Sequence, residues 1–144
     1  MLDQNDPVSV ELDPDDIDLL CDGLSEWGGA AHCTDEMAVG MGFLDVDDLL
    51  AESHRLQTAL QRRAALTPRD WARALVATEI VFASAVFGSG DDWPITTARS
   101  DEDTIRRLRE VQMKLSPYIH RPAARLGTTR RARGGPTGQS QLDP

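Results

Sequence analysis

Apolar side chains recur at helical spacing along most of the sequence, and capping residues mark where each helix should begin. The first such stretch opens with Asp13 and Pro14, carries an apolar stripe from Ile17 to Trp27, and meets two glycines at 28–29. Aspartate accepts hydrogen bonds from the free amides of a first turn, and proline fits the first helical position. The pattern therefore predicts a helix that begins at Pro14 and ends at the glycine pair.

Two more amphipathic stretches follow before residue 65. Thr34 opens a short one that ends near Gly42, and Asp45 opens a long one whose apolar stripe continues to Ala64. Both openings place acidic residues in the first turn, where they complement the positive end of the helix dipole. The sequence thus predicts a short helix, a glycine turn and a helix of about five turns.

The segment from Trp71 to Phe87 is apolar on nearly every side. It follows Thr67-Pro68-Arg69-Asp70, which combines a capping residue, a first-turn proline and an acid three residues after the cap. A helix that is apolar all round belongs in the interior of a bundle, covered by other helices. Because an apolar run alone does not settle the period, a buried strand is the alternative for this segment.

The last amphipathic stretch begins at Ser100 and ends at Pro117, after the longest internal loop, Gly88–Thr97. We therefore predict an all-α fold, a compact bundle of about five helices around a central apolar helix at residues 71–87. In domain terms, we predict a flexible lead-in at residues 1–12, a helical domain at residues 13–120 and a disordered Arg/Gly/Pro-rich tail at residues 121–144.

The net charge of −9 is distributed unevenly along the chain. Residues 1–60 carry 15 acidic side chains against the single Arg55, which gives −14, while residues 61–120 sum to +1 and residues 121–144 to +4. The strongly anionic front half favours an interaction or regulatory protein that presents an acidic helical surface to a protein partner of basic character. The residues that we expect in this partner surface are Asp45, Asp47, Asp48 and Glu52.

No segment approaches the roughly 18 apolar residues of a membrane span, and the first residues are acidic where a secretory signal would be basic. These features predict a cytoplasmic protein without a membrane partner. Arginine outnumbers lysine 14 to 1, which is typical of a GC-rich genome. The stretches 34–43 and 70–84 are also similar in style to small bacterial proteins.

Candidate zinc ligands are present but poorly spaced. Cys21, His32 and Cys33 include no C-x-x-C pair and no second histidine at helical spacing, and Cys21 lies on the apolar stripe of the first helix. Ser-His-Asp, G-x-S-x-G, P-loop and H-E-x-x-H patterns are missing from the sequence. We therefore predict no metal, no cofactor and a non-enzymatic role.

The segment Thr34–Glu52 resembles a helix-turn-helix motif in layout, with Ala38 and Gly42 at the small-residue and turn positions. The resemblance implies a DNA-binding regulator. However, the helix that would enter the major groove begins with the acidic residues named above, which DNA phosphates repel. The charge therefore disfavours nucleic acid as a partner and favours a plain helix–glycine–helix corner.

Glu79 lies in the most apolar predicted helix, where an isolated charge is destabilising. One hypothesis is a buried ion pair with an arginine, for which the candidates are Arg73, Arg106, Arg107 and Arg109. The alternative is a small-molecule-binding protein or minor enzyme, in which Glu79 binds a basic ligand or transfers a proton and the loop Gly88–Thr97 borders the pocket. The residues expected in that pocket are Trp71, Glu79, Asp91, Asp92 and Trp93.

Overall fold

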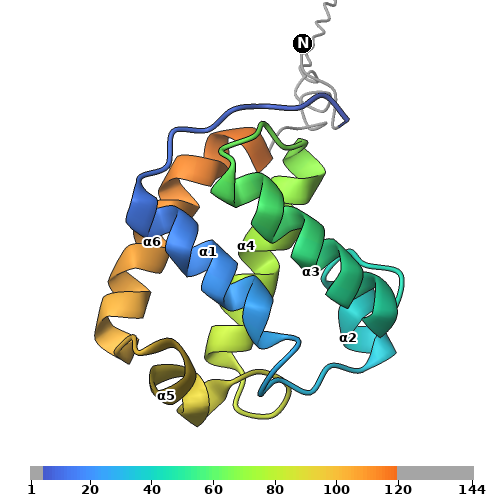
Figure 1. Cartoon of the computed structure of the whole chain (residues 1–144), viewed down its shortest axis with the longest axis vertical. Coiled ribbons are helices and arrows are strands. Elements are labelled where there is room, and N and C mark those ends of the chain that lie inside the picture. The colour runs from blue at the N-terminus through green and yellow to red at the C-terminus, as the bar shows by residue number, and fades with distance from the viewer. Residues whose placement is uncertain (1–4, 120–144) are drawn as a thin grey trace, which may run out of the picture.

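A computed structural model describes residues 5–119, and these residues form a bundle of α-helices (Figure 1). The helices are α1 (Pro14–Glu26), α2 (Asp35–Gly40), α3 (Val46–Gln61), α4 (Pro68–Ala83), α5 (Trp93–Thr97) and α6 (Asp101–Ile119), and the 3-10 turn η1 (Gly90–Asp92) precedes α5. The described part of the chain contains no strand, only an isolated bridge between Val8 and Leu66. The predicted all-α bundle is confirmed, and the alternative of a strand for the apolar segment is wrong.

Helices α1 and α4 pack against each other in the middle of the bundle, with α3 on one side and α6 on the other (Figure 1). The helix that the sequence marked as central, α4, contacts α1, α3 and α6. Helix α1 contacts three helices as well, although its sequence is far more polar. The bundle is therefore built around a pair of helices.

The approach of α1 to α4 depends on the absence of a side chain at Gly23. A Cβ atom at this position would lie 2.4 Å from Oγ1 and 2.6 Å from Cγ2 of Thr78, which is fully buried on α4. The Thr78 hydroxyl is held in place because it donates to the Ala74 carbonyl at 2.9 Å. On the same side, the Trp27 indole Nε1 donates to the Ala77 carbonyl at 3.0 Å.

The core consists mainly of leucines that the helical periodicity turns inward, together with the aromatic side chains of Trp27, Phe43, Trp71 and Trp93. Burial of one such side chain stabilises the fold by about 1.5–3 kcal/mol relative to leaving it exposed. The fully buried aliphatic side chains are Leu19, Leu20, Leu24, Leu49, Leu56, Leu60, Val81, Val111 and Leu115.

The predicted helix starts are confirmed by their capping bonds. The side chains of Asp13, Thr34, Asp45 and Thr67 each accept a hydrogen bond from the backbone amide three residues later. At the start of α1 the bond is reciprocated, because the Asp16 carboxylate accepts from the backbone amide of Asp13. These caps satisfy first-turn amides that have no partner within the helix.

Helix α4 ends at Ala83, not at Phe87 as its apolar composition predicted. Ser84 adopts an extended backbone, and its hydroxyl accepts hydrogen bonds from the amides of Val86 and Phe87. Serine competes with helical hydrogen bonding in this way. The chain then folds back so closely that a Cβ at Gly88 would lie 2.4 Å from the Val81 carbonyl oxygen.

The segment predicted as a long loop contains η1 and α5, which position Trp93 in the core. Trp93 is fully buried, donates from Nε1 to the Thr104 hydroxyl at 2.8 Å, and packs edge-on against Phe82. Helix α6 continues to Ile119, beyond the predicted end at Pro117. A proline in the last turn removes one helical hydrogen bond and does not require the helix to stop there.

Residues 5–12, predicted as part of a flexible lead-in, pack along the bundle. Val8 and Leu12 are buried, and the Val8 amide donates to the Leu66 carbonyl at 2.7 Å. The Trp71 indole donates to the Val8 carbonyl at 3.0 Å, and Arg63 donates to the Leu12 carbonyl at 2.7 Å. The packed domain thus begins before residue 13, while residues 1–4 and the predicted tail at 121–144 lie outside the described residues.

None of the helices within residues 5–119 combines the length and the apolar character needed to cross a bilayer.

Replacing Gly23 by alanine should destabilise the fold by about 1–3 kcal/mol, because the new methyl group would overlap Thr78. The matched control is Gly40→Ala in α2, where the added Cβ meets no atom within 4 Å. The control should be neutral or slightly stabilising, since alanine is the better helix former. Urea unfolding followed by circular dichroism measures both variants, and equal effects would contradict the α1–α4 contact. Adding Thr78→Ala to Gly23→Ala should recover part of the loss.

Candidate functional site

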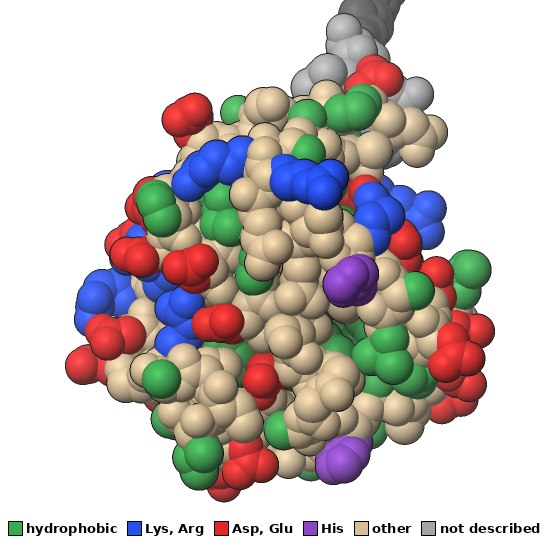
Figure 2. Space-filling view, in the orientation of Figure 1, with side chains coloured by type: hydrophobic (Ala, Val, Ile, Leu, Met, Phe, Trp, Pro, Cys, Tyr) green, Lys and Arg blue, Asp and Glu red, His purple; other side chains and the backbone are tan. Residues whose placement is uncertain are grey.

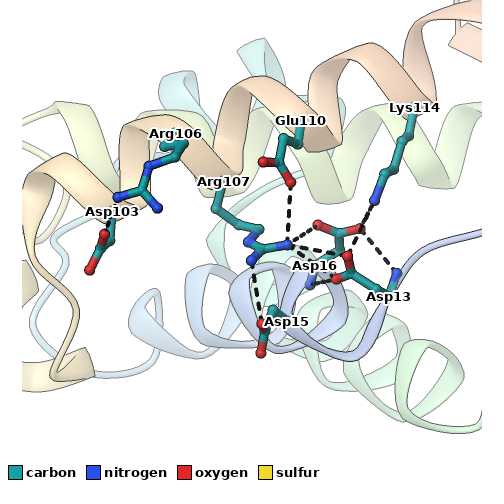
Figure 3. A network of polar contacts seen from close by, with 8 residues as sticks. All are labelled: Asp13, Asp15, Asp16, Asp103, Arg106, Arg107, Glu110 and Lys114. Carbon is teal, nitrogen blue, oxygen red and sulfur yellow. Dashed lines mark hydrogen bonds and ion pairs between the residues drawn. The ribbon is translucent and has the colours of Figure 1, made fainter.

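The acidic residues at the start of α1 are paired with cations on α6 (Figure 3). Asp16 is fully buried, and its carboxylate contacts Lys114 at 2.5 Å and Arg107 at 3.2 Å. Arg107 also lies 3.2 Å from Asp13 and 3.3 Å from Asp15. The backbone amide of Asp16, with added attraction from Lys114 and Arg107, lowers the pKa of Asp13. Two cations thus compensate part of the charge of these carboxylates and stabilise the contact between α1 and α6.

A second network joins α3 to α4. The Arg73 guanidinium contacts Glu52 at 2.9 Å and Asp70 at 2.5 Å, and Arg55 contacts the same two carboxylates at 2.8 and 3.0 Å. The hydrogen bond from Arg55, supported by Arg73, lowers the pKa of Glu52. Arg73 also stacks on the Phe43 ring, 4.9 Å from its centroid. Glu52, expected in the partner surface, therefore has a structural role in this network.

The other acidic residues expected in the partner surface lie around the corner between α2 and α3. The Asp45 carboxylate accepts from the Asp48 amide at 2.8 Å, and the Asp48 carboxylate accepts from the Leu44 amide at 3.0 Å. Asp35 accepts from the Val46 amide at 3.0 Å, while Asp47 is exposed. Bonds to backbone amides fix these side chains without cancelling their negative charge.

The corner also exposes large apolar side chains. Leu44 is 76% exposed and Val39 is 58% exposed, and Leu50 on α3 is exposed as well. Figure 2 shows hydrophobic side chains next to acidic ones over α2 and the start of α3. Isolated exposed leucines are common, but a group of them bordered by charges is typical of an interaction site. The α2–α3 surface, as named below, comprises Asp35, Glu36, Val39, Leu44, Asp45, Asp47, Asp48 and Leu50.

The acids of the α2–α3 surface have no cationic partners within the described part of the chain. Among residues 5–119, none of them forms an ion pair with lysine or arginine. Elsewhere in the acidic half, Asp13, Asp15, Asp16, Asp22 and Glu52 form ion pairs, whereas Glu11, Asp18 and Glu26 form none within these residues. The α2–α3 surface is thus a place where five unpaired acids gather.

Glu79 is half-buried between α4 and α6, and its described partner is an amide rather than an arginine. Gln112 donates from Nε2 to the Glu79 carboxylate at 2.6 Å, and Arg109 donates to the Gln112 Oε1 at 2.9 Å. Within residues 5–119, Glu79 forms no ion pair, so the predicted Glu–Arg pair is not formed there. The physical reason is that Arg107 points toward Asp16 on α1 and Arg109 bonds to Gln112, so that an amide lies opposite the half-buried carboxylate.

Two hollows flank the bond between Glu79 and Gln112. One has a volume of about 270 Å³ and is lined mainly by side chains near Phe82 and Ile105, and the other has a volume of about 360 Å³ and extends from Leu75 to Ile119. Both are predominantly apolar and both include Glu79 and Gln112. We call the surface that contains them the α4–α6 face.

The residues predicted to form a pocket with Glu79 are not gathered there. Trp71 is buried against the N-terminal segment, and Trp93 is buried in the core. Asp91 and Asp92 are exposed on η1. None of these four residues lines either hollow beside Glu79. The pocket hypothesis in its original form is therefore not supported by the arrangement of its residues.

A buried polar cluster at the end of α1 was not anticipated from the sequence. The Glu26 carboxylate is buried and accepts hydrogen bonds from the hydroxyls of Ser89 and Thr96, both at 2.5 Å. These bonds connect α1 to the segment that carries η1 and α5. Serine and threonine residues in a loop gave no signal for this contact, because such residues are equally common where they face solvent.

The described residues contain no group of three or more His, Cys, Asp and Glu side chains suited to hold a metal ion. Cys21 and Cys33 are both free, and Cys21 is buried among apolar neighbours on α1. Burial, together with the charges of Asp18 and Asp22, raises the pKa of the Cys21 thiol to about 11. This thiol is therefore protonated at neutral pH and acts as a small core side chain.

Comparisons of the chain with protein-family models, with curated proteins and with solved structures find no match. A functional assignment must therefore come from the chemistry of the described surfaces. Two of these surfaces could bind a partner. The α2–α3 surface has acids without ion pairs among the described residues, and the α4–α6 face has two hollows.

Replacing Lys114 by methionine should destabilise the protein by about 1–2 kcal/mol, because the buried Asp16 would lose one of its two cationic partners. Lys114 is 35% exposed, so water replaces part of the lost interaction. The matched control is Arg106→Met, which removes an exposed ion pair with Asp103 and should change stability by less than about 0.5 kcal/mol. Urea unfolding measures both, and a control as destabilised as Lys114→Met would argue against the network.

The dependence of stability on pH should follow from the same networks. The pKa values of Asp13 and Glu52 lie below their ordinary 3.8 and 4.5, so their stabilising contribution is present above those values and is lost as the pH falls through the lowered ones. The pKa of Lys114 lies above its ordinary 10.5, chiefly because of its hydrogen bond to Asp16. Its contribution is present below 10.5 and is lost as the pH rises through the raised value. Urea midpoints across the pH range measure this, and Glu52→Gln should flatten the acidic limb.

Proposed function

We propose that this protein is a non-enzymatic interaction or regulatory protein that binds a basic protein partner through the α2–α3 surface. The observation that carries the proposal is that five carboxylates gather beside exposed apolar side chains at the α2–α3 surface and have no lysine or arginine partner among the described residues, whereas Asp13, Asp15 and Asp16 at the start of α1 are paired with α6. A partner that supplies lysine or arginine side chains would balance the negative charge of this surface.

The exposed apolar side chains provide the second part of the argument. Covering Leu44 and Val39 removes apolar area from water, which contributes about 25 cal/mol for each Å² buried. The surrounding carboxylates orient the partner and raise the rate of encounter, although they add less to the final affinity. A centre of apolar contacts bordered by charges is the common arrangement of protein interfaces.

The chemistry of the surface also indicates the kind of partner. A segment with leucine-like side chains flanked by lysine or arginine, such as a basic amphipathic helix, would match both the apolar and the acidic positions. Duplex DNA offers phosphates instead and would be repelled by Asp45 and Asp47 at the start of α3. We place the interaction in the cytoplasm, in keeping with the two unpaired cysteines.

The proposal is tested by capture of proteins from a cell lysate on the immobilised protein. Leu44→Ser, and separately the combined change of Asp45, Asp47 and Asp48 to Asn, should each reduce capture of basic proteins at least about fivefold. Capture by the unchanged protein should also weaken as the salt concentration rises. Met113→Ser is the matched control because Met113 is as exposed as Leu44 but lies on α6. The proposal that the α2–α3 surface binds the partner would be refuted if capture did not depend on the salt concentration, or if it were unchanged in the variant with all three Asp-to-Asn changes.

A further inference from the structure

The α4–α6 face carries a carboxylate and a guanidinium that lack charged partners. Glu79 and Arg109 lie on either side of Gln112, which donates to the first and accepts from the second. Neither forms an ion pair within residues 5–119. A face that offers one unpaired charge of each sign is complementary to a second copy of itself.

The α4–α6 face also has apolar side chains, some of which project from the surface while others line its hollows. Ile105 on α6 lines one of the hollows, is 49% exposed and projects from the surface. The two hollows beside Glu79 are recessed, because alanine and serine side chains line part of them. The face therefore combines projecting side chains with recesses, and two copies can fill each other's recesses.

We propose that two copies of this chain associate through the α4–α6 face about a two-fold axis. In such an arrangement every contact occurs twice, because the same two residues meet again with the roles of the two copies exchanged. With the axis between Glu79 and Arg109, α6 of each copy lies over α4 of the other. Each Arg109 then lies near the Glu79 of the opposite copy.

A dimer of this kind leaves the α2–α3 surface free. Helix α6 lies on one side of the α1–α4 pair, and α2 and α3 lie on the other (Figure 1). The dimer would present two α2–α3 surfaces that face away from the interface, which allows bivalent binding to a partner with two basic segments. The dimer does not require that the proposed function is right, because the two surfaces share no residue.

Sedimentation equilibrium of the full chain tests the proposal. The mass should approach twice the 15.8 kDa of one chain as the concentration rises into the range of about 100 µM. Glu79→Arg and Arg109→Glu should each weaken association at least about tenfold, since each places like charges opposite one another. Combining the two changes restores opposite charges and should return the association constant to within about threefold of the original.

Two further variants keep the test independent of folding defects. Ile105→Ser removes an exposed side chain of the α4–α6 face, and it should weaken association at least about fivefold. Leu50→Ser, at similar exposure on the α2–α3 surface, should leave association unchanged. Circular dichroism melting checks that each variant is folded. A chain that stays monomeric, or a dimer whose association constant is unchanged by both charge reversals and by Ile105→Ser, would overturn the proposal.

Discussion

The close approach of α1 to α4 at Gly23 is the constraint on which the rest of the bundle depends. Any side chain at this position would overlap Thr78, so α4 can lie against α1 only because a glycine interrupts the apolar stripe. The contact fixes the Trp27 indole on the Ala77 carbonyl and brings α3 and α6 against both sides of the pair. The position of α6 in turn brings Arg107 and Lys114 to the buried carboxylate of Asp16. A glycine, through the contact that it permits, thereby supports an ion-pair network more than one helical turn away.

The electrostatics of the molecule follow from the same arrangement. The bundle has more acids than bases, so packing α6 against α1 uses the available cations on one side. Arg55 and Arg73 are used similarly between α3 and α4. Arg73 reaches the corner between α2 and α3 only through the Gly42 carbonyl and the Phe43 ring, and the carboxylates of the corner bind backbone amides instead. The corner therefore keeps a group of carboxylates without a cationic partner among the described residues, which a sum over the sequence does not reveal.

The sequence predicted the features that depend on local interactions. Capping residues such as Asp13 and Thr67 act on amides three residues away, so their effect is visible in the sequence itself. The end of α4 was misplaced because Ala85 and Val86 are apolar yet exposed, and the hydroxyl of Ser84 ends the helix. Composition alone does not distinguish an apolar residue in a helix from one in a turn.

Features that join distant parts of the chain were not predictable in the same way. The partners of Glu26 lie 63 and 70 residues further on, and Glu79 meets Gln112 across 33 residues. The sequence indicated correctly that Glu79 needs a partner, but every arginine considered for it was an equal candidate until α6 had been placed. Arg107 turned toward α1, which left an amide opposite Glu79. Similarly, Glu52 was indistinguishable from Asp47 until α4 brought Arg73 to it.

The hollows of the α4–α6 face have a cause in side-chain size. Helices α4 and α6 meet through an inner row that includes the fully buried Val81 and Val111, while the positions just outside that row are Ala72, Ala83 and Ser116. These side chains are too short to meet across the gap between two helix surfaces, and protein interiors rarely leave such gaps unfilled. Both hollows open to the surface, where the second copy that we propose would fill them with its own side chains and place its Arg109 near Glu79.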